Sequence, residues 1–110
     1  MGNLDRLELF KQFSKEEPEN PFNWYALALE YSKTDTIKAA ELFEMLLTDF
    51  EAYLPTYYTS AHFFTDLEEI SKAKLIYEKG IELAQNQQEI KALQELKNAY
   101  QNFCFEYDFD

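Results

Sequence analysis

Apolar residues recur every three to four positions in six stretches of the chain, and short polar runs separate these stretches. This spacing puts one apolar side chain per turn on a common face, so each stretch is predicted to form an amphipathic helix. No window ahead of the C-terminal tail alternates apolar and polar residues as a half-buried strand does. The fold is therefore predicted to be all-α, with helices over residues 4–14, 22–33, 37–50, 55–65, 71–84 and 89–104.

Three prolines mark predicted helix boundaries. Pro18 lies in the polar run 15–20 and ends the first helix, because a proline cannot continue the backbone hydrogen bonding. Pro21 and Pro55 instead suit a first helical turn, where the missing N–H costs nothing. Asn20 stands before Pro21 and can cap the free amides of the helix that follows.

Length, charge and cysteine content limit the class of protein. The 110 residues fit a single domain, 1–110, around one core. With 10 Lys and Arg against 21 Asp and Glu, the net charge is −11, and such a surface repels nucleic-acid phosphates and anionic lipid. Neither is expected as a partner. Cys104 is the single cysteine, and no apolar run resembles a membrane span or signal peptide, which predicts a cytoplasmic protein without disulfides.

An internal repeat is the most informative feature of the sequence. Large aromatic residues bracket small ones in one helical pair, and the pattern returns 33 residues later in the first helix (24 to 57) and 34 later in the second (43 to 77). A small side chain lets a neighbouring helix approach closely, and the rings fill the space beside it. The pattern Trp24, Leu27, Ala28, Tyr31, Ala39 and Phe43 recurs as Tyr57, Ser60, Ala61, Phe64, Ala73 and Tyr77.

This pattern resembles the tetratricopeptide repeat, a helix–turn–helix unit of about 34 residues. Segments 24–31 and 57–64 are similar to its first helices, and segments 39–43 and 73–77 to its second helices. The resemblance implies a right-handed α-solenoid of about six antiparallel helices. It divides the chain into a leading helix (1–17), two repeats (21–51 and 55–86), a capping helix (89–104) and an acidic-aromatic tail (105–110).

The sequence departs from the family pattern at three places, and each departure predicts a local structural feature. Neither repeat has the usual glycine between its helices, so Asp35 or Asp66 is expected to adopt the left-handed backbone conformation instead. Lys97 occupies a small-residue position and would block a following helix, which predicts a cap with a polar outer face. Gly80 stands where the family favours alanine, and a close helix contact is the expected reason.

The resemblance implies a non-enzymatic protein-interaction module with a concave groove lined by the first helices. Its chaperone-cofactor members grip a C-terminal carboxylate with basic side chains, but here the equivalent stripe has only Lys33 at its end. A protein or peptide partner with a basic or apolar segment is therefore expected. The predicted groove residues are Tyr25, Leu29, Ser32, Tyr58, His62, Thr65, Gln94 and Asn98.

The predicted groove could instead be closed by packing or remain empty. Two other functions are also alternatives to a binding groove. The chain could form a homodimer through its aromatic tail or the face of its first helix. His62, the single histidine, and Asp66 could pair as a general base, but no nucleophile, glycine-rich loop or second metal ligand accompanies them. No catalytic residue, metal site or cofactor is therefore predicted.

The C-terminal tail and its cysteine have two interpretations each. Aromatic residues alternate with Cys104 and three acidic residues, so the tail could be an extended arm that docks on a groove. Alternatively Phe103 and Phe105 finish the capping helix and the rest frays. Cys104 is predicted to fill space in the interior rather than to be a reactive thiol, because no cation lies near it in sequence.

Overall fold

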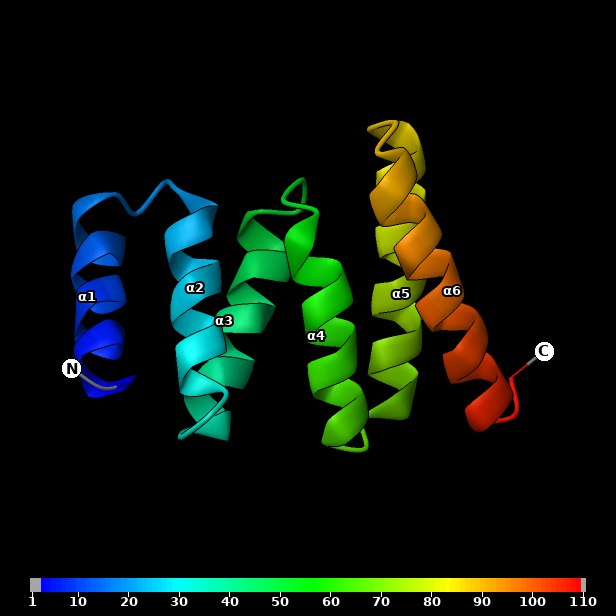
Figure 1. The fold of residues 1–110 in the computed structure, drawn as a ribbon, viewed down its shortest axis with the longest axis horizontal. Helices are drawn as coiled ribbons and strands as arrows, with labels where there is room; N and C mark the ends of the chain where they lie inside the picture. Colours follow the sequence, from blue (N-terminus) through cyan, green and yellow to red (C-terminus); the bar gives the residue numbers. More distant parts are fainter. Residues whose placement is uncertain (1–2, 110) are drawn as a thin grey trace. The chain divides into compact units, whose positions relative to one another are not determined.

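The computed structural model describes residues 3–109, with side chains from residue 6 onward, and every regular element in that range is an α-helix. The chain divides between Thr56 and Tyr57 into two compact units, called unit 1 and unit 2 below. Every helix end lies within two residues of its predicted position. The helices are α1 (Asn3–Glu16), α2 (Pro21–Tyr31), α3 (Thr36–Asp49), α4 (Pro55–Asp66), α5 (Ile70–Asn86) and α6 (Ile90–Glu106) (Figure 1).

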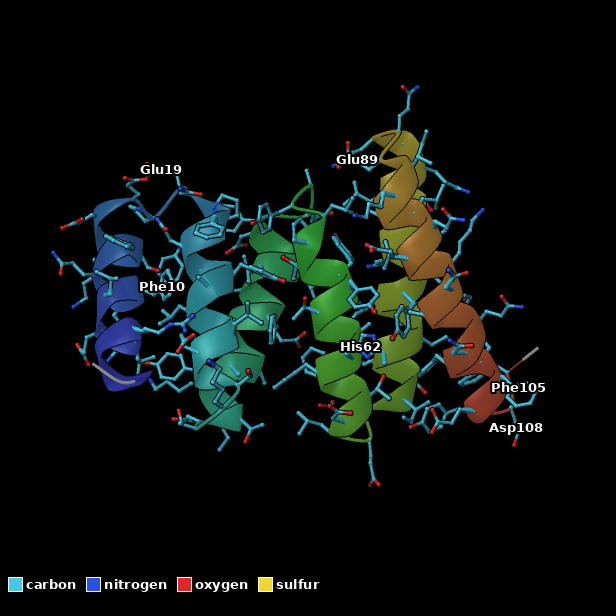
Figure 2. All side chains as sticks on the ribbon, viewed as in Figure 1. Phe10, Glu19, His62, Glu89, Phe105 and Asp108 are labelled. Atoms are coloured by element: carbon cyan, nitrogen blue, oxygen red, sulfur yellow. The ribbon has the colours of Figure 1, made fainter. Side chains whose placement is uncertain are left out.

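In unit 1, α2 packs against both α1 and α3. Phe43 and Leu46 of α3 are completely buried, and Phe10 of α1 points toward α2 (Figure 2). Ala28 of α2 and Ala39 of α3, two of the small residues of the repeat, have no exposed surface. Small side chains at both positions allow the close approach of the helices that the repeat predicted.

The helix starts of unit 1 use the signals found in the sequence. The Phe22 N–H donates to the side-chain oxygen of Asn20 at 3.1 Å, and Pro21 occupies the first turn of α2. The Trp24 indole N–H donates to the Pro18 carbonyl at 2.8 Å, which fixes the loop before α2. Asp35 caps α3 by accepting from the Lys38 N–H at 3.2 Å.

A buried carboxylate connects α1 and α2. The side chain of Glu30 is only 4% exposed, and its Oε2 lies 3.3 Å from Arg6 of α1 and 3.3 Å from Lys33. Its Oε1 has no hydrogen-bond partner among the described residues. Two cations on one oxygen compensate the burial of this charge, so Glu30 holds α1 and α2 together rather than lining a binding surface.

In unit 2, α5 packs on both α4 and α6. Gly80 of α5 lies directly against Tyr57 of α4 and close to Leu96 of α6, which confirms the expected close contact. Ala61 and Ala73 have no exposed surface, as the repeat predicted. Ile90 lies at the first position of α6 and is 78% exposed.

A polar network also joins α5 to α6. The Tyr100 hydroxyl donates to Oε2 of Glu78 at 2.7 Å, and Lys74 pairs with the same oxygen at 2.9 Å. The hydrogen bonds from Lys74 and Tyr100 lower the pKa of the Glu78 carboxyl below its usual value. Burial raises the pKa of the Tyr100 hydroxyl, and the hydrogen bond to Glu78 adds to this effect.

The left-handed backbone positions differ from the expectation. Asp35 has a negative φ (−145°) and caps α3, and Asp66 is the last residue of α4. Positive φ values occur instead at Glu68 (63°), Gln88 (59°) and Asp108 (60°). Each follows a helix end and is succeeded by a residue whose N–H returns to a carbonyl five positions earlier: Glu69 to Phe64, Glu89 to Ala84 and Phe109 to Cys104.

The C-terminal tail is neither an extended arm nor a frayed end over the described residues. α6 continues to Glu106, and the chain then turns back through Asp108. The Phe109 ring stacks on Phe103 with 5.8 Å between centroids, and Lys74 lies 5.2 Å from the Phe109 ring centre. Phe105 points away from the helices and is 87% exposed (Figure 2). Cys104 is half-buried.

Candidate functional site

Unit 2 contains a groove of about 510 Å³ lined by side chains of all three of its helices. α4 and α6 supply most of the lining, and α5 contributes Tyr77. The α6 residues recur at intervals of three and four, so they form a single stripe along the helix. The lining residues are Tyr58, His62, Thr65, Asp66, Tyr77, Glu95, Asn98, Ala99, Asn102, Phe103, Glu106 and Tyr107.

Aromatic rings form much of this groove. Tyr58 and His62 lie one turn apart on α4 with 4.7 Å between ring centroids, and His62 meets Tyr77 edge-on at 6.0 Å. Figure 2 shows His62 projecting from α4 toward α5. Tyr77 also lies 5.3 Å from Phe103, which in turn lies 5.1 Å from Tyr107. A continuous set of rings therefore runs from α4 across α5 to the end of α6.

The charge of the groove is negative. Asp66, Glu95 and Glu106 line it, and no lysine or arginine is among its described lining residues. Burial raises the pKa of the Tyr77 hydroxyl to about 12, with further contributions from Tyr58 and Asp66. Tyr77 is only 2% exposed.

Four of the five predicted groove residues in unit 2 lie together in this groove. Thr65 is half-buried, with its hydroxyl donating to the Ala61 carbonyl at 2.7 Å, and Tyr58, His62 and Asn98 are exposed at the surface. Gln94 is exposed but is not among the lining residues. The lining stripe of α6 starts at Glu95, so the helix presents a face rotated by one residue from the face that the repeat register predicted.

Sequence reasoning missed several lining residues. Tyr77 was predicted only as a position of the repeat and Phe103 only as part of the capping helix; both are buried, and each also borders the groove. Asp66 was considered only as a partner for His62. The remaining lining residues lie on one helical stripe that begins at Glu95, and this periodicity could have predicted them from the sequence. They are Ala99, Asn102, Glu106 and Tyr107.

The other three predicted groove residues belong to unit 1, with Tyr25 and Leu29 on α2 and Ser32 at its C-cap. Tyr25 is half-buried and packs edge-on against Tyr53 with 5.8 Å between ring centroids. Burial raises the pKa of the Tyr53 hydroxyl, and Tyr25 adds to the shift. Leu29 is half-buried, and its carbonyl accepts a hydrogen bond from the exposed Ser32 hydroxyl at 2.6 Å. A binding role for these residues stays a prediction.

The groove has few features of a catalytic centre. His62 and Asp66 both line it, but the ring contacts of His62 are with Tyr58 and Tyr77. Among residues 3–109, no three His, Cys, Asp or Glu side chains gather closely enough to hold a metal ion. In the same range, no helix is both long and apolar enough to span a bilayer.

Comparison with known proteins identifies the family. No protein-family model and no curated protein matches the chain. The chain is similar to a solved structure, the solution NMR structure of a tetratricopeptide repeat domain protein from Salinibacter ruber. The two are 37% identical, with a TM-score of 0.74, and the match covers 78% of this chain and 88% of the other. This chain belongs to the tetratricopeptide repeat family.

The division of the chain into repeats stays a prediction. It assigns α2 with α3 and α4 with α5 to the two full repeats, α1 to a leading half-repeat and α6 to a capping helix. The all-α solenoid class predicted from the repeat is confirmed. Within unit 2, most of the groove lining comes from α4 and α6, two of the helices on which binding residues were predicted.

Proposed function

We propose that this tetratricopeptide repeat protein is a non-enzymatic interaction module that binds a basic or apolar segment of a partner protein in the groove of unit 2. The observation that carries the proposal is the groove itself, in which Tyr58, His62, Thr65 and Asn98 meet. Tyr25, Leu29, Ser32 and Gln94 stay predicted binding residues. A cytoplasmic location is part of the same proposal.

The composition of the groove supports binding rather than catalysis. Tyrosine provides a large, rigid contact surface at low conformational-entropy cost, and Tyr58 remains 43% exposed on the groove. Asn98 and Asn102 can donate to and accept from the backbone of a bound segment. An exposed ring flanked by amide side chains is typical of a peptide-binding surface.

A random nine-residue peptide library displayed on phage tests this function. We expect selection against the protein to enrich peptides whose binding falls at least about tenfold in the variant Tyr58→Ala plus Asn98→Ala, because the double change removes groove contacts worth about 1.4 kcal/mol or more. Leu75→Ala is the matched control, since Leu75 is 58% exposed and lies outside the groove. Equal binding by all three proteins would overturn the proposal.

The α1 surface supports a second candidate function, a homodimer through the first helix. Leu9 and Phe13 of α1 remain 46% and 37% exposed in unit 1. Light scattering across a concentration series separates the two functions, because a homodimer forms without any added peptide. If the dimer forms through α1, Leu9→Lys will make the protein monomeric; a monomer at every concentration would exclude this candidate.

A further inference from the structure

We infer that the segment held in the unit 2 groove is extended and carries two arginines about five residues apart. This inference rests on the proposed binding function and specifies the chemistry of the bound segment. Three features of the groove support it: the sign of its charge, the arrangement of its rings, and the distance between its acidic ends.

The charge of the groove selects for cations. Three carboxylates line it, from Asp66, Glu95 and Glu106, and no described lining residue neutralises them. The whole chain carries a net charge of −11, so the surrounding field also attracts positive segments and repels acidic ones. An acidic or C-terminal carboxylate ligand would meet repulsion at both ends of the groove.

The rings favour arginine over lysine. Tyr58 and His62 are exposed rings of the groove that the carboxylates also line. A guanidinium is planar and weakly hydrated, so it can stack on such rings while it forks to a carboxylate, whereas an ammonium acts as a strongly hydrated point charge.

The spacing of the two arginines follows from the separation of the carboxylates along α6. Glu95 and Glu106 are eleven residues apart on one helix, which corresponds to roughly 16 Å along its axis. Figure 1 shows the carboxyl ends of α4 and α6 at the same end of unit 2, so Asp66 and Glu106 both belong to the lower end of the groove. An extended segment rises about 3.3 Å per residue, and five residues therefore span the distance between the two acidic ends.

The peptide library described above, followed by two matched comparisons, tests this inference. We expect the enriched peptides to contain two arginines four to six positions apart. Replacing both arginines of the tightest peptide by citrulline, a neutral isostere, should weaken binding at least about tenfold, and replacing them by lysine should weaken it about threefold. Binding should also weaken as salt increases, because the contacts lie at a solvent-exposed surface.

Two protein variants of equal charge provide the control. Asp66→Asn plus Glu106→Gln should weaken the arginine peptide about fivefold to tenfold, the range for two exposed charge contacts. Glu82→Gln plus Glu89→Gln makes the same change in net charge at exposed positions outside the groove and should leave affinity within about twofold. A like loss in both variants would show that only net charge matters and would overturn the inference.

The outcomes separate this inference from the proposed function. Enriched peptides without arginine, still sensitive to Tyr58→Ala plus Asn98→Ala, would overturn the arginine specificity and leave the interaction module standing. Equal binding of the citrulline peptide would do the same. Selection of no peptide that depends on the groove residues would overturn both.

Discussion

Gly80 of α5 lies so close to Tyr57 of α4 that a methyl group on Gly80 would meet the Tyr57 Cβ at 2.7 Å. The same methyl would lie 3.3 Å from a Leu96 methyl of α6. Because the Tyr57 Cβ is tied to its backbone, the contact can be relieved only by moving α4 and α5 apart. Gly80 therefore sets the distance between the helices that hold the groove residues Tyr58 and Tyr77.

Gly80→Ala is expected to destabilise the protein by about 1–2 kcal/mol. Overpacking costs about 1–3 kcal/mol, and the better helix propensity of alanine returns up to about 1 kcal/mol. Urea denaturation measures the difference. Lys79→Ala, at the exposed neighbouring position, should change the free energy of unfolding by less than about 0.5 kcal/mol. A Gly80→Ala protein as stable as the original would contradict the close packing of α4 and α5.

Gln88→Gly is expected to stabilise the protein by about 1 kcal/mol. Gln88 adopts φ 59° after α5, where glycine avoids the steric cost that an L side chain meets. Gln87 offers a matched control, because it is the same residue type one position earlier with φ −85°. Gln87→Gly should bring no gain. Thermal melting distinguishes the two, and a similar effect of both substitutions would contradict the left-handed turn.

Phe109→Ala is expected to lower stability by about 1 kcal/mol, because it removes the ring stacked on Phe103 and the contact with Lys74. Phe105→Ala is the control, since Phe105 lies four residues earlier with 87% of its surface already exposed. Phe105→Ala should change the free energy of unfolding by less than about 0.5 kcal/mol. Equal melting temperatures for the two variants would show that the tail does not pack on α6.

Stability is expected to fall as the pH rises from 10 to 12. Folding raises the pKa of Tyr77 from its usual 10 to about 12, so its contribution is complete below pH 10 and is lost as the pH rises through 12. The raised pKa values of Tyr53 and Tyr100 act in the same direction. Tyr77→Phe should reduce the slope of unfolding free energy against pH in this range. A slope equal to that of the original protein would refute this assignment.

The helices and their small contact residues could be predicted from the sequence because both depend on local patterns. Ala28, Ala39, Ala61 and Ala73 are fully buried, where the repeat placed them. The left-handed residues could not be predicted in this way. Glu68 has a positive φ because the chain reverses there and the Glu69 N–H donates to the Phe64 carbonyl. Neither glutamate is a residue type that favours a positive φ, so the sequence gives no signal for this turn.

The groove was only partly predictable, since its lining depends on how far α6 is rotated. The repeat register implied Gln94, but the helix presents Glu95 to the groove, a rotation of about 100°. The tail was ambiguous for a related reason. Phe103 and Tyr107 are four residues apart, so they share a face of the helix. With Phe105 between them, the same residues also fit the two-residue alternation of an extended strand, and the sequence alone does not decide between the two.

NMR mapping of amide chemical shifts on adding the tightest library-selected peptide tests the central claim most directly. If the groove of unit 2 is the binding site, the largest changes will fall on α4 around Tyr58 and His62 and on α6 around Asn98 and Asn102. Changes centred on Leu9 and Phe13 of α1, with none in the groove, would contradict the account.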